Sequence, residues 1–171
     1  MSGNAVVGAL LEDLLGRGIH ARVRVTGASM GRAVRSGDVV ILAPLAGPAA
    51  RGDLVMYRNA GGDLVLHRVL RLWRDARGNA RYQTRGDANL RLDAVVAGDR
   101  ILGRVAAVER RGAQIVDLTT ATARRRAHAV ALAHLAVSGL VYKLARALRH
   151  CGRIAAGLSG PATHRRLTTD R

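Results

Sequence analysis

A serine, a histidine and two aspartates are the residues of this sequence whose types could together support nucleophilic catalysis. Ser29 follows a predicted strand, and His67 lies within another predicted strand that is otherwise largely apolar. A serine nucleophile needs a base within hydrogen-bonding distance and a third group that orients this base. His67 is a candidate base because an imidazole titrates near neutral pH. Asp87 and Asp93 follow His67 in the chain and complete the set of candidates.

Each of these residues also has an explanation that involves no catalysis. A loop serine such as Ser29 commonly satisfies a neighbouring backbone group. His67 could be a hydrogen-bonded histidine of the core or of the sheet surface. Asp87 follows Gly86, and a Gly-Asp pair is typical of a turn, whereas this explanation is weaker for Asp93. No single residue therefore decides between the two interpretations.

Short strands are predicted for most of the chain up to residue 118. Val23 and Val25 alternate with Arg22 and Arg24, which is the period of two that is typical of a half-buried strand. Further strands are predicted at Val39–Ala43, Leu54–Arg58, Leu64–Arg74, Arg81–Thr84, Ile101–Val108 and Gln114–Leu118.

Five Gly-Asp pairs punctuate this part of the sequence. Glycine readily adopts a positive φ and aspartate hydrogen-bonds its own backbone, so each pair is expected to form a turn. The pairs are Gly37-Asp38, Gly52-Asp53, Gly62-Asp63, Gly86-Asp87 and Gly98-Asp99. Short strands with such turns predict a mainly-β domain over residues 21–120, built from hairpins or as a small barrel.

A helix is predicted on each side of the β domain. Residues 4–17 carry valines and leucines at spacings of three and four, which predicts a short helix within an N-terminal segment of residues 1–20. Residues 121–156 are predicted to form a basic amphipathic helical tail, and residues 157–171 are expected to form a disordered end.

Positive charge is concentrated in the tail. The whole chain has a formal net charge of +16, and residues 121–171 hold ten basic residues and one acidic residue. Within the predicted helix Ala127–Arg149, Val130 and Val137 share one face. Two placements stay open for this helix: packing on the β core, or binding to an anionic membrane surface through residues 124–150.

Composition argues against several other classes of protein. The uncharged run of 16 residues, 127–142, is shorter than the roughly 20 residues that span a bilayer. The single cysteine, Cys151, allows no intrachain disulfide or Cys-based metal site, and we expect no metal and no cofactor. Aromatic residues make up 2% of the chain, which disfavours a nucleic-acid surface. Residues 1–18 lack the basic segment of a signal peptide and resemble no membrane anchor.

Several short motifs occur in an order that is more specific than any one of them. They are Gly27-Ala28-Ser29-Met30, Ser36-Gly37-Asp38-Val39-Val40, Arg51-Gly52-Asp53-Leu54-Val55, His67-Arg68-Val69, Thr84-Arg85-Gly86-Asp87-Ala88-Asn89 and Ile101-Leu102-Gly103-Arg104-Val105. This series resembles the S24/S26 serine peptidase superfamily, and most closely the signal peptidases of the endoplasmic-reticulum type. The resemblance covers about Arg22 to Glu109, which is roughly half of the chain.

The resemblance implies a small S24/S26-type β-barrel-like core and a role for each candidate residue. Ser29 matches the nucleophile, His67 the base, Asp93 the acid that orients the base, and Asp87 a second functionally important acid. The Ser–Lys dyad of other family members is not available, because the only lysine, Lys143, lies in the tail. The implied activity is that of a serine endopeptidase that cleaves a leader or signal-type peptide segment.

Parts of the sequence also suggest two other functions. A self-cleaving, repressor-like regulator is disfavoured, because only 28 residues precede Ser29 and they contain no helix-turn-helix pattern. A non-catalytic protein could instead use its basic tail to bind a membrane or a nucleic acid. Without an N-terminal anchor, the peptidase is expected in the cytoplasm, either free or held at the inner face of the membrane by its tail.

Overall fold

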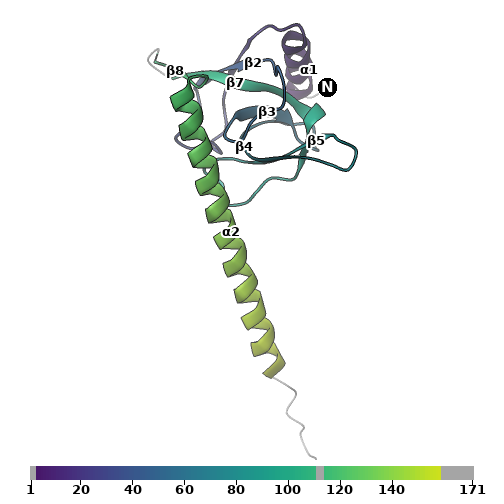
Figure 1. Ribbon diagram of the computed structural model, residues 1–171, viewed down its shortest axis with the longest axis vertical. Coiled ribbons are helices and arrows are strands. Elements are labelled where there is room, and N and C mark those ends of the chain that lie inside the picture. The colour runs from purple at the N-terminus through teal and green to yellow at the C-terminus, as the bar shows by residue number, and fades with distance from the viewer. Residues whose placement is uncertain (1–2, 111–113, 159–171) are drawn as a thin grey trace, which may run out of the picture. The chain divides into compact units, whose positions relative to one another are not determined.

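The computed structural model describes residues 3–110 and 114–158, and its main element is one antiparallel sheet of eight strands (Figure 1). The predicted mainly-β class is therefore confirmed. The elements in chain order are α1 (Gly3–Gly16), β1 (Ala21–Arg24), β2 (Val39–Ala43), β3 (Leu54–Arg58), β4 (Leu64–Arg74), β5 (Ala80–Arg85), β6 (Val96–Ala97), the 3-10 helix η1 (Gly98–Arg100), β7 (Ile101–Glu109), β8 (Ile115–Asp117) and α2 (Ala121–Leu158).

Each predicted strand is present, and the differences lie at the strand ends and in one added strand. The two-residue strand β6 and the turn η1 were not predicted, because Val96 and Ala97 are too few to show a period of two. The pairing of β6 with β5 depends on tertiary structure, since Tyr82 lies opposite Val96.

The sheet curls around strand β7, which pairs with three other strands (Figure 1). The strand order is β1-β2-β7-β3-β4-β5-β6, and β8 also pairs with β7. The N-terminal half of β7 pairs with β3, and its C-terminal half pairs with β2 and β8. Register shifts interrupt the β2–β7 and β3–β7 ladders, and such bulges increase local twist and bend a sheet.

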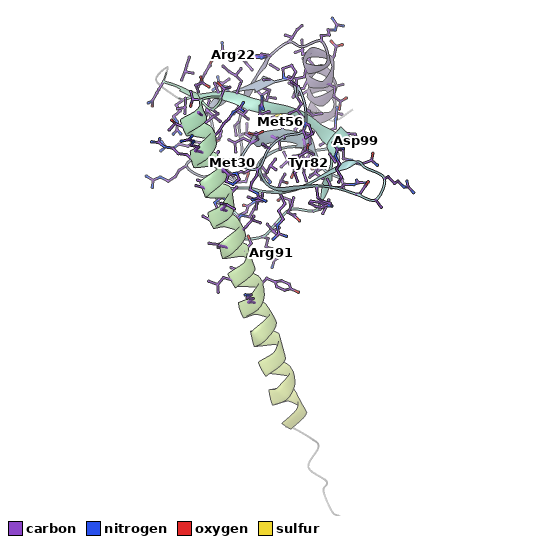
Figure 2. The ribbon with its side chains drawn as sticks, in the orientation of Figure 1. Arg22, Met30, Met56, Tyr82, Arg91 and Asp99 are labelled. Atoms are coloured by element: carbon purple, nitrogen blue, oxygen red, sulfur yellow. The ribbon has the colours of Figure 1, made fainter. Side chains whose placement is uncertain are left out.

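Strand β3 separates two hydrophobic clusters because its residues are buried on both faces. Leu54 and Met56 belong to the larger cluster, which also holds Met30 and the α1 residues Leu11 and Leu15 (Figure 2). Val55 and Tyr57 point to the opposite face and belong to the second cluster with Val69, Tyr82, Val96, Ile101 and Ala49. Both faces of the sheet are thus available to hold side chains in a fixed position.

Helix α2 belongs to two compact units, which divide between Ser138 and Gly139. Its first part, up to Ser138, lies in the same unit as the sheet and packs against it. Ala131 is fully buried, whereas Val130 and Val137 are exposed. The valine face predicted as the apolar face is therefore not the one that packs on the sheet.

The close approach of α2 to the sheet explains this choice of face. A Cβ at Gly52 would lie 2.7 Å from the carbonyl carbon of Ala127, so the helix backbone almost touches the turn before β3. Only small residues fit on a helix face at this distance. The valines would hold the helix too far away, and they face outward instead.

The second unit is described as helix from Gly139 to Leu158, two residues beyond the predicted end of the tail helix. Residues 159–171, which make up most of the predicted disordered end, lie outside the described residues. Among the described helices, α2 included, none combines the length and the apolar character that a membrane crossing requires.

Substitution of two glycines by alanine tests the contact between α2 and the sheet. Gly52 and Gly62 both have a positive φ, of 97° and 86°, and a Cβ at Gly62 would meet only open space. We expect Gly62→Ala to lower the free energy of unfolding by about 1–3 kcal/mol through backbone strain alone. Gly52→Ala should cost a further 1–3 kcal/mol or so, because its methyl group overlaps α2.

Urea denaturation of the two variants and the wild type measures this difference. Gly62→Ala serves as the control for backbone strain. Equal losses of stability in the two variants would contradict the close packing of α2 against the turn at Gly52.

Candidate active site

Ser29 lies in the segment that connects β1 to β2. Its neighbour Met30 is 1% exposed, and Val34 is fully buried, so both side chains anchor the segment in the core. The segment also forms tight turns, in which the N–H of Gly31 donates to the carbonyl of Ala28. Ser29 is thereby left half-buried at a fixed position.

His67 lies on β4, directly opposite Val55 of β3. Because facing residues of an antiparallel pair share one side of the sheet, His67 projects from the same face as Val55 and Tyr57. The imidazole is 7% exposed and meets the Tyr57 ring edge-on, with ring centroids 6.4 Å apart. This explains how a histidine is accommodated in an apolar strand.

Three of the four candidate residues form one hydrogen-bonded chain. Ser29 Oγ lies 3.0 Å from His67 Nε2, and His67 Nδ1 lies 2.6 Å from Asp93 Oδ2. These residues are 38 and 26 positions apart in the sequence. The arrangement has the geometry of a nucleophile, a base and a group that orients the base.

The carboxylate of Asp93 is held by residues of β3 and β5. Thr84 Oγ1 donates to Asp93 Oδ2 at 2.8 Å, and the Tyr57 hydroxyl donates to the same oxygen at 3.3 Å. The backbone of Asp93 is also fixed, because its N–H donates to the carbonyl of Thr84 and its carbonyl accepts from the Gln83 side chain.

These contacts decide the charge of the site. Burial raises the pKa of Asp93, but the hydrogen bonds from His67 and Thr84 outweigh burial, and the pKa lies below its ordinary value. Burial raises the pKa of Tyr57 to about 12, and the negative charge of Asp93 acts in the same direction. At neutral pH, Asp93 is therefore a carboxylate and Tyr57 a protonated donor.

Asp87 contacts neither Ser29 nor His67. Its two oxygens accept hydrogen bonds from Arg68 Nε and Nη2, at 2.8 and 2.6 Å, and this ion pair is largely buried. Arg68 is the neighbour of His67 on β4, and the third nitrogen of its guanidinium donates to the carbonyl of Gly52. Asp87 therefore lies outside the hydrogen-bonded chain and is held to β4 by Arg68.

The loop of Asp87 is hydrogen-bonded to the segment that carries the serine. The N–H of Ala88 donates to the carbonyl of Ser29 at 2.8 Å. A Cβ at Gly86 would lie 2.6 Å from this carbonyl oxygen and 2.9 Å from His67 Nε2. Glycine is required here by a close approach of two segments. The prediction that Gly86 provides a positive φ is wrong, and so is that for Gly98.

Helix α2 contributes a further histidine next to Asp87. His134 Nδ1 lies 3.5 Å from Asp87 Oδ1, and Arg85 donates from Nη1 to Ser138 Oγ at 2.6 Å. Burial and the positive charge of Arg85 lower the pKa of His134, so this imidazole is neutral at neutral pH. The contact between His134 and Asp87 is consequently not an ion pair under these conditions.

A hollow of about 620 Å³ adjoins Ser29 and His67. We call it the apolar hollow, because its lining includes Val7, Val23, Val25, Met30, Met56, Leu64 and Leu66. Among the residues that the structure describes, no group of three or more potential metal ligands occurs. The groups that the site brings together are a hydroxyl, an imidazole and a carboxylate.

No protein-family model matches the chain, and neither does any curated protein.

Three residues that hold the candidate site were not identified from the sequence. Thr84 lies in the motif that contains Gly86 and Asp87, so its position two residues before Gly86 was an available signal. Arg68 follows His67 directly, but nothing in the sequence indicates that it pairs with Asp87. Tyr57 carries no sequence signal, because its contact with Asp93 requires the pairing of β3 with β4.

Substitution of Thr84 tests the cause of the lowered pKa of Asp93. Thr84→Val removes one donor from the carboxylate while keeping the shape of the side chain, so the pKa of Asp93 should rise. Carbon-13 NMR of the Asp93 carboxyl group as a function of pH measures this shift. Thr84→Ser keeps the hydroxyl and should titrate nearly as the wild type does.

The same shift predicts how stability depends on pH. A carboxyl group with a depressed pKa stabilises the folded state above its unfolded pKa of about 3.9, and this contribution is lost as pH falls through the folded pKa. Thr84→Val should reduce this acid-sensitive part of the free energy of unfolding. Identical titration of Asp93 in Thr84→Val and wild type would rule out the hydroxyl as its partner.

Proposed function

We propose that this protein is a serine endopeptidase of the S24/S26 type that cleaves a leader or signal-type peptide segment. The observation that carries the proposal is the hydrogen-bonded chain from Ser29 Oγ through the imidazole of His67 to Asp93. The three residues occupy the positions that the resemblance assigns to nucleophile, base and orienting acid.

The proposed reaction begins with attack of Ser29 Oγ on the carbonyl carbon of the scissile peptide bond. His67 Nε2 takes the hydroxyl proton and later gives it to the leaving amine. Water then attacks the acyl-enzyme ester, with His67 again as the base, and Ser29 is regenerated. Backbone N–H groups beside Ser29 would stabilise the oxyanion, at about 10²–10³ in rate for each donor.

The surroundings of Asp93 support the role of His67 as a base. The charged Asp93 accepts a hydrogen bond from Nδ1–H of His67. In a neutral imidazole the other nitrogen, Nε2, is then unprotonated and can accept the proton of Ser29. When His67 becomes an imidazolium, Asp93 stabilises the positive charge. Thr84 and Tyr57 keep the carboxylate oriented by donating to the same oxygen.

The apolar hollow supports a peptide as the substrate. Within the described chain, β1 pairs with β2 alone, so its other edge offers backbone groups to an extended segment. Val23 of β1 and Val25 just beyond it line the hollow next to this edge. An extended peptide could add to β1 while its small or apolar side chains fill the hollow, as leader and signal segments provide.

A serine-reactive probe and a peptide-cleavage assay test the proposal together. The probe should label Ser29, and His67→Ala should abolish labelling because the hydroxyl loses its base. Ser29→Ala and His67→Ala should each lower the cleavage rate by about 10³-fold or more. Mass spectrometry of the labelled peptide and the initial rates of cleavage are the measurements.

Matched controls are available for both residues. Ser36 and His128 are exposed and lie outside the hydrogen-bonded chain, so Ser36→Ala and His128→Ala should retain labelling and cleavage. Full activity of Ser29→Ala, or labelling of another residue in the wild type, would show that the proposed nucleophile is wrong.

A further inference from the structure

Two hollows meet at His67, and their linings differ in charge. The apolar hollow contains Ser29, and Arg24 is the only residue with a permanent charge in the described part of its lining. A second hollow, of about 590 Å³, is lined by His67 and Asp93 but not by Ser29. Three arginines, Arg58, Arg81 and Arg100, line this second hollow, which we call the arginine hollow.

Positive charge dominates the arginine hollow. Among the residues that the structure describes, Asp93 is the only carboxylate in its lining, and it is already engaged by His67. Asp99 precedes Arg100 and is labelled in Figure 2, but it does not line the hollow. A negatively charged group that enters this space therefore meets an excess of positive charge beside the candidate catalytic residues.

The three arginines differ in how firmly they are paired. Arg58 contacts Glu12 at 2.7 Å, and Arg81 contacts Asp75 at 2.8 Å. Glu12 is half exposed, and ion pairs of this kind contribute little to stability, so a ligand can compete for these arginines.

Arg100 differs because its guanidinium bonds to the carbonyl of Asn59, at 3.0 Å, and pairs with no carboxylate among the described residues. The side chain is exposed. It is consequently the cation that is most readily available to a ligand in the hollow.

The proposed reaction indicates which part of a substrate lies in each hollow. The part on the N-terminal side of the scissile bond becomes attached to Ser29, which lines the apolar hollow and not the arginine hollow. The part on the C-terminal side carries the leaving amine, which His67 must protonate. His67 lines both hollows, and the one that Ser29 does not line is the arginine hollow.

We infer that the arginine hollow is a subsite for acidic side chains on the C-terminal side of the scissile bond, and that Arg100 is its main specificity determinant. This inference rests on the proposed function. Because His67 itself lines the hollow and an extended chain advances by about 3.3 Å per residue, the first few residues after the bond are those to be tested for acidic side chains. The preferred substrate thus has an apolar segment before the cleavage point and an acidic segment after it.

A series of matched peptides tests the inference with the full-length protein. All peptides share one apolar segment before the bond and carry Asp, Asn or Lys at the second to fourth positions after it. The wild type should cleave the Asp peptide with a kcat/KM about 3–10-fold above that of the Asn peptide, and the Lys peptide should be slowest. Added salt should reduce the preference, because these charges are exposed to solvent.

Substitution of Arg100 provides the sharper comparison. Arg100→Gln should reduce the preference for the Asp peptide, and Arg100→Glu should favour the Lys peptide over the Asp peptide. Arg77→Glu makes the same change in net charge at an exposed position outside the hollow, and it should keep the wild-type ranking. Circular dichroism establishes that each variant is folded, and Arg100→Gln retains a donor for the carbonyl of Asn59.

The outcomes separate the two proposals. If the wild type cleaves none of the peptides and its serine is not labelled, the proposed function itself fails. If the peptides are cleaved in a Ser29-dependent manner but at equal rates, the arginine hollow is not a subsite. A preference for acidic residues before the bond, or an unchanged ranking in both Arg100 variants, would overturn the assignment of the hollow or of Arg100.

Discussion

A carboxylate that must stay charged inside the protein is the constraint on which the candidate site depends. Burial disfavours the charge of Asp93, and three donors compensate for it: His67, Thr84 and Tyr57. Because these donors stand on β4, β5 and β3, the site forms only when three strands pair in one register. The sheet is therefore part of the chemistry, since a register slip of one residue would turn His67 to the opposite face.

The second aspartate links the site to the rest of the fold by a different contact. Asp87 pairs with Arg68, the neighbour of His67, and its loop donates a hydrogen bond to the carbonyl of Ser29. The ion pair thereby connects the strand that carries the base to the segment that carries the proposed nucleophile. The first part of α2 packs beside this loop, because His134 lies next to Asp87 and Ser138 accepts a hydrogen bond from Arg85, two residues before Asp87.

Much of the fold could be predicted from local pattern. The strands Val39–Ala43, Leu54–Arg58 and Leu64–Arg74 begin and end at the predicted residues, because alternation and continuous apolar runs directly reflect burial. The apolar face predicted for α2 was wrong, because its valines are exposed. The helix backbone lies so close to Gly52 that valine side chains would not fit between the helix and the sheet. Close approach of two backbones leaves only small residues as its sequence signal, and small residues are common elsewhere.

The sequence by itself determined which residue types were available: a serine after a strand, a histidine within one, two aspartates beyond it, and no lysine near them. Only the tertiary structure decided that Asp93 meets the histidine and Asp87 does not, because both aspartates lie within eight residues of Gly86 and neither spacing favours one over the other. The positions of Tyr57 and Arg68 were decided in the same way. A hydrogen bond between distant residues depends on strand pairing and chain reversal, which local sequence periodicity does not encode.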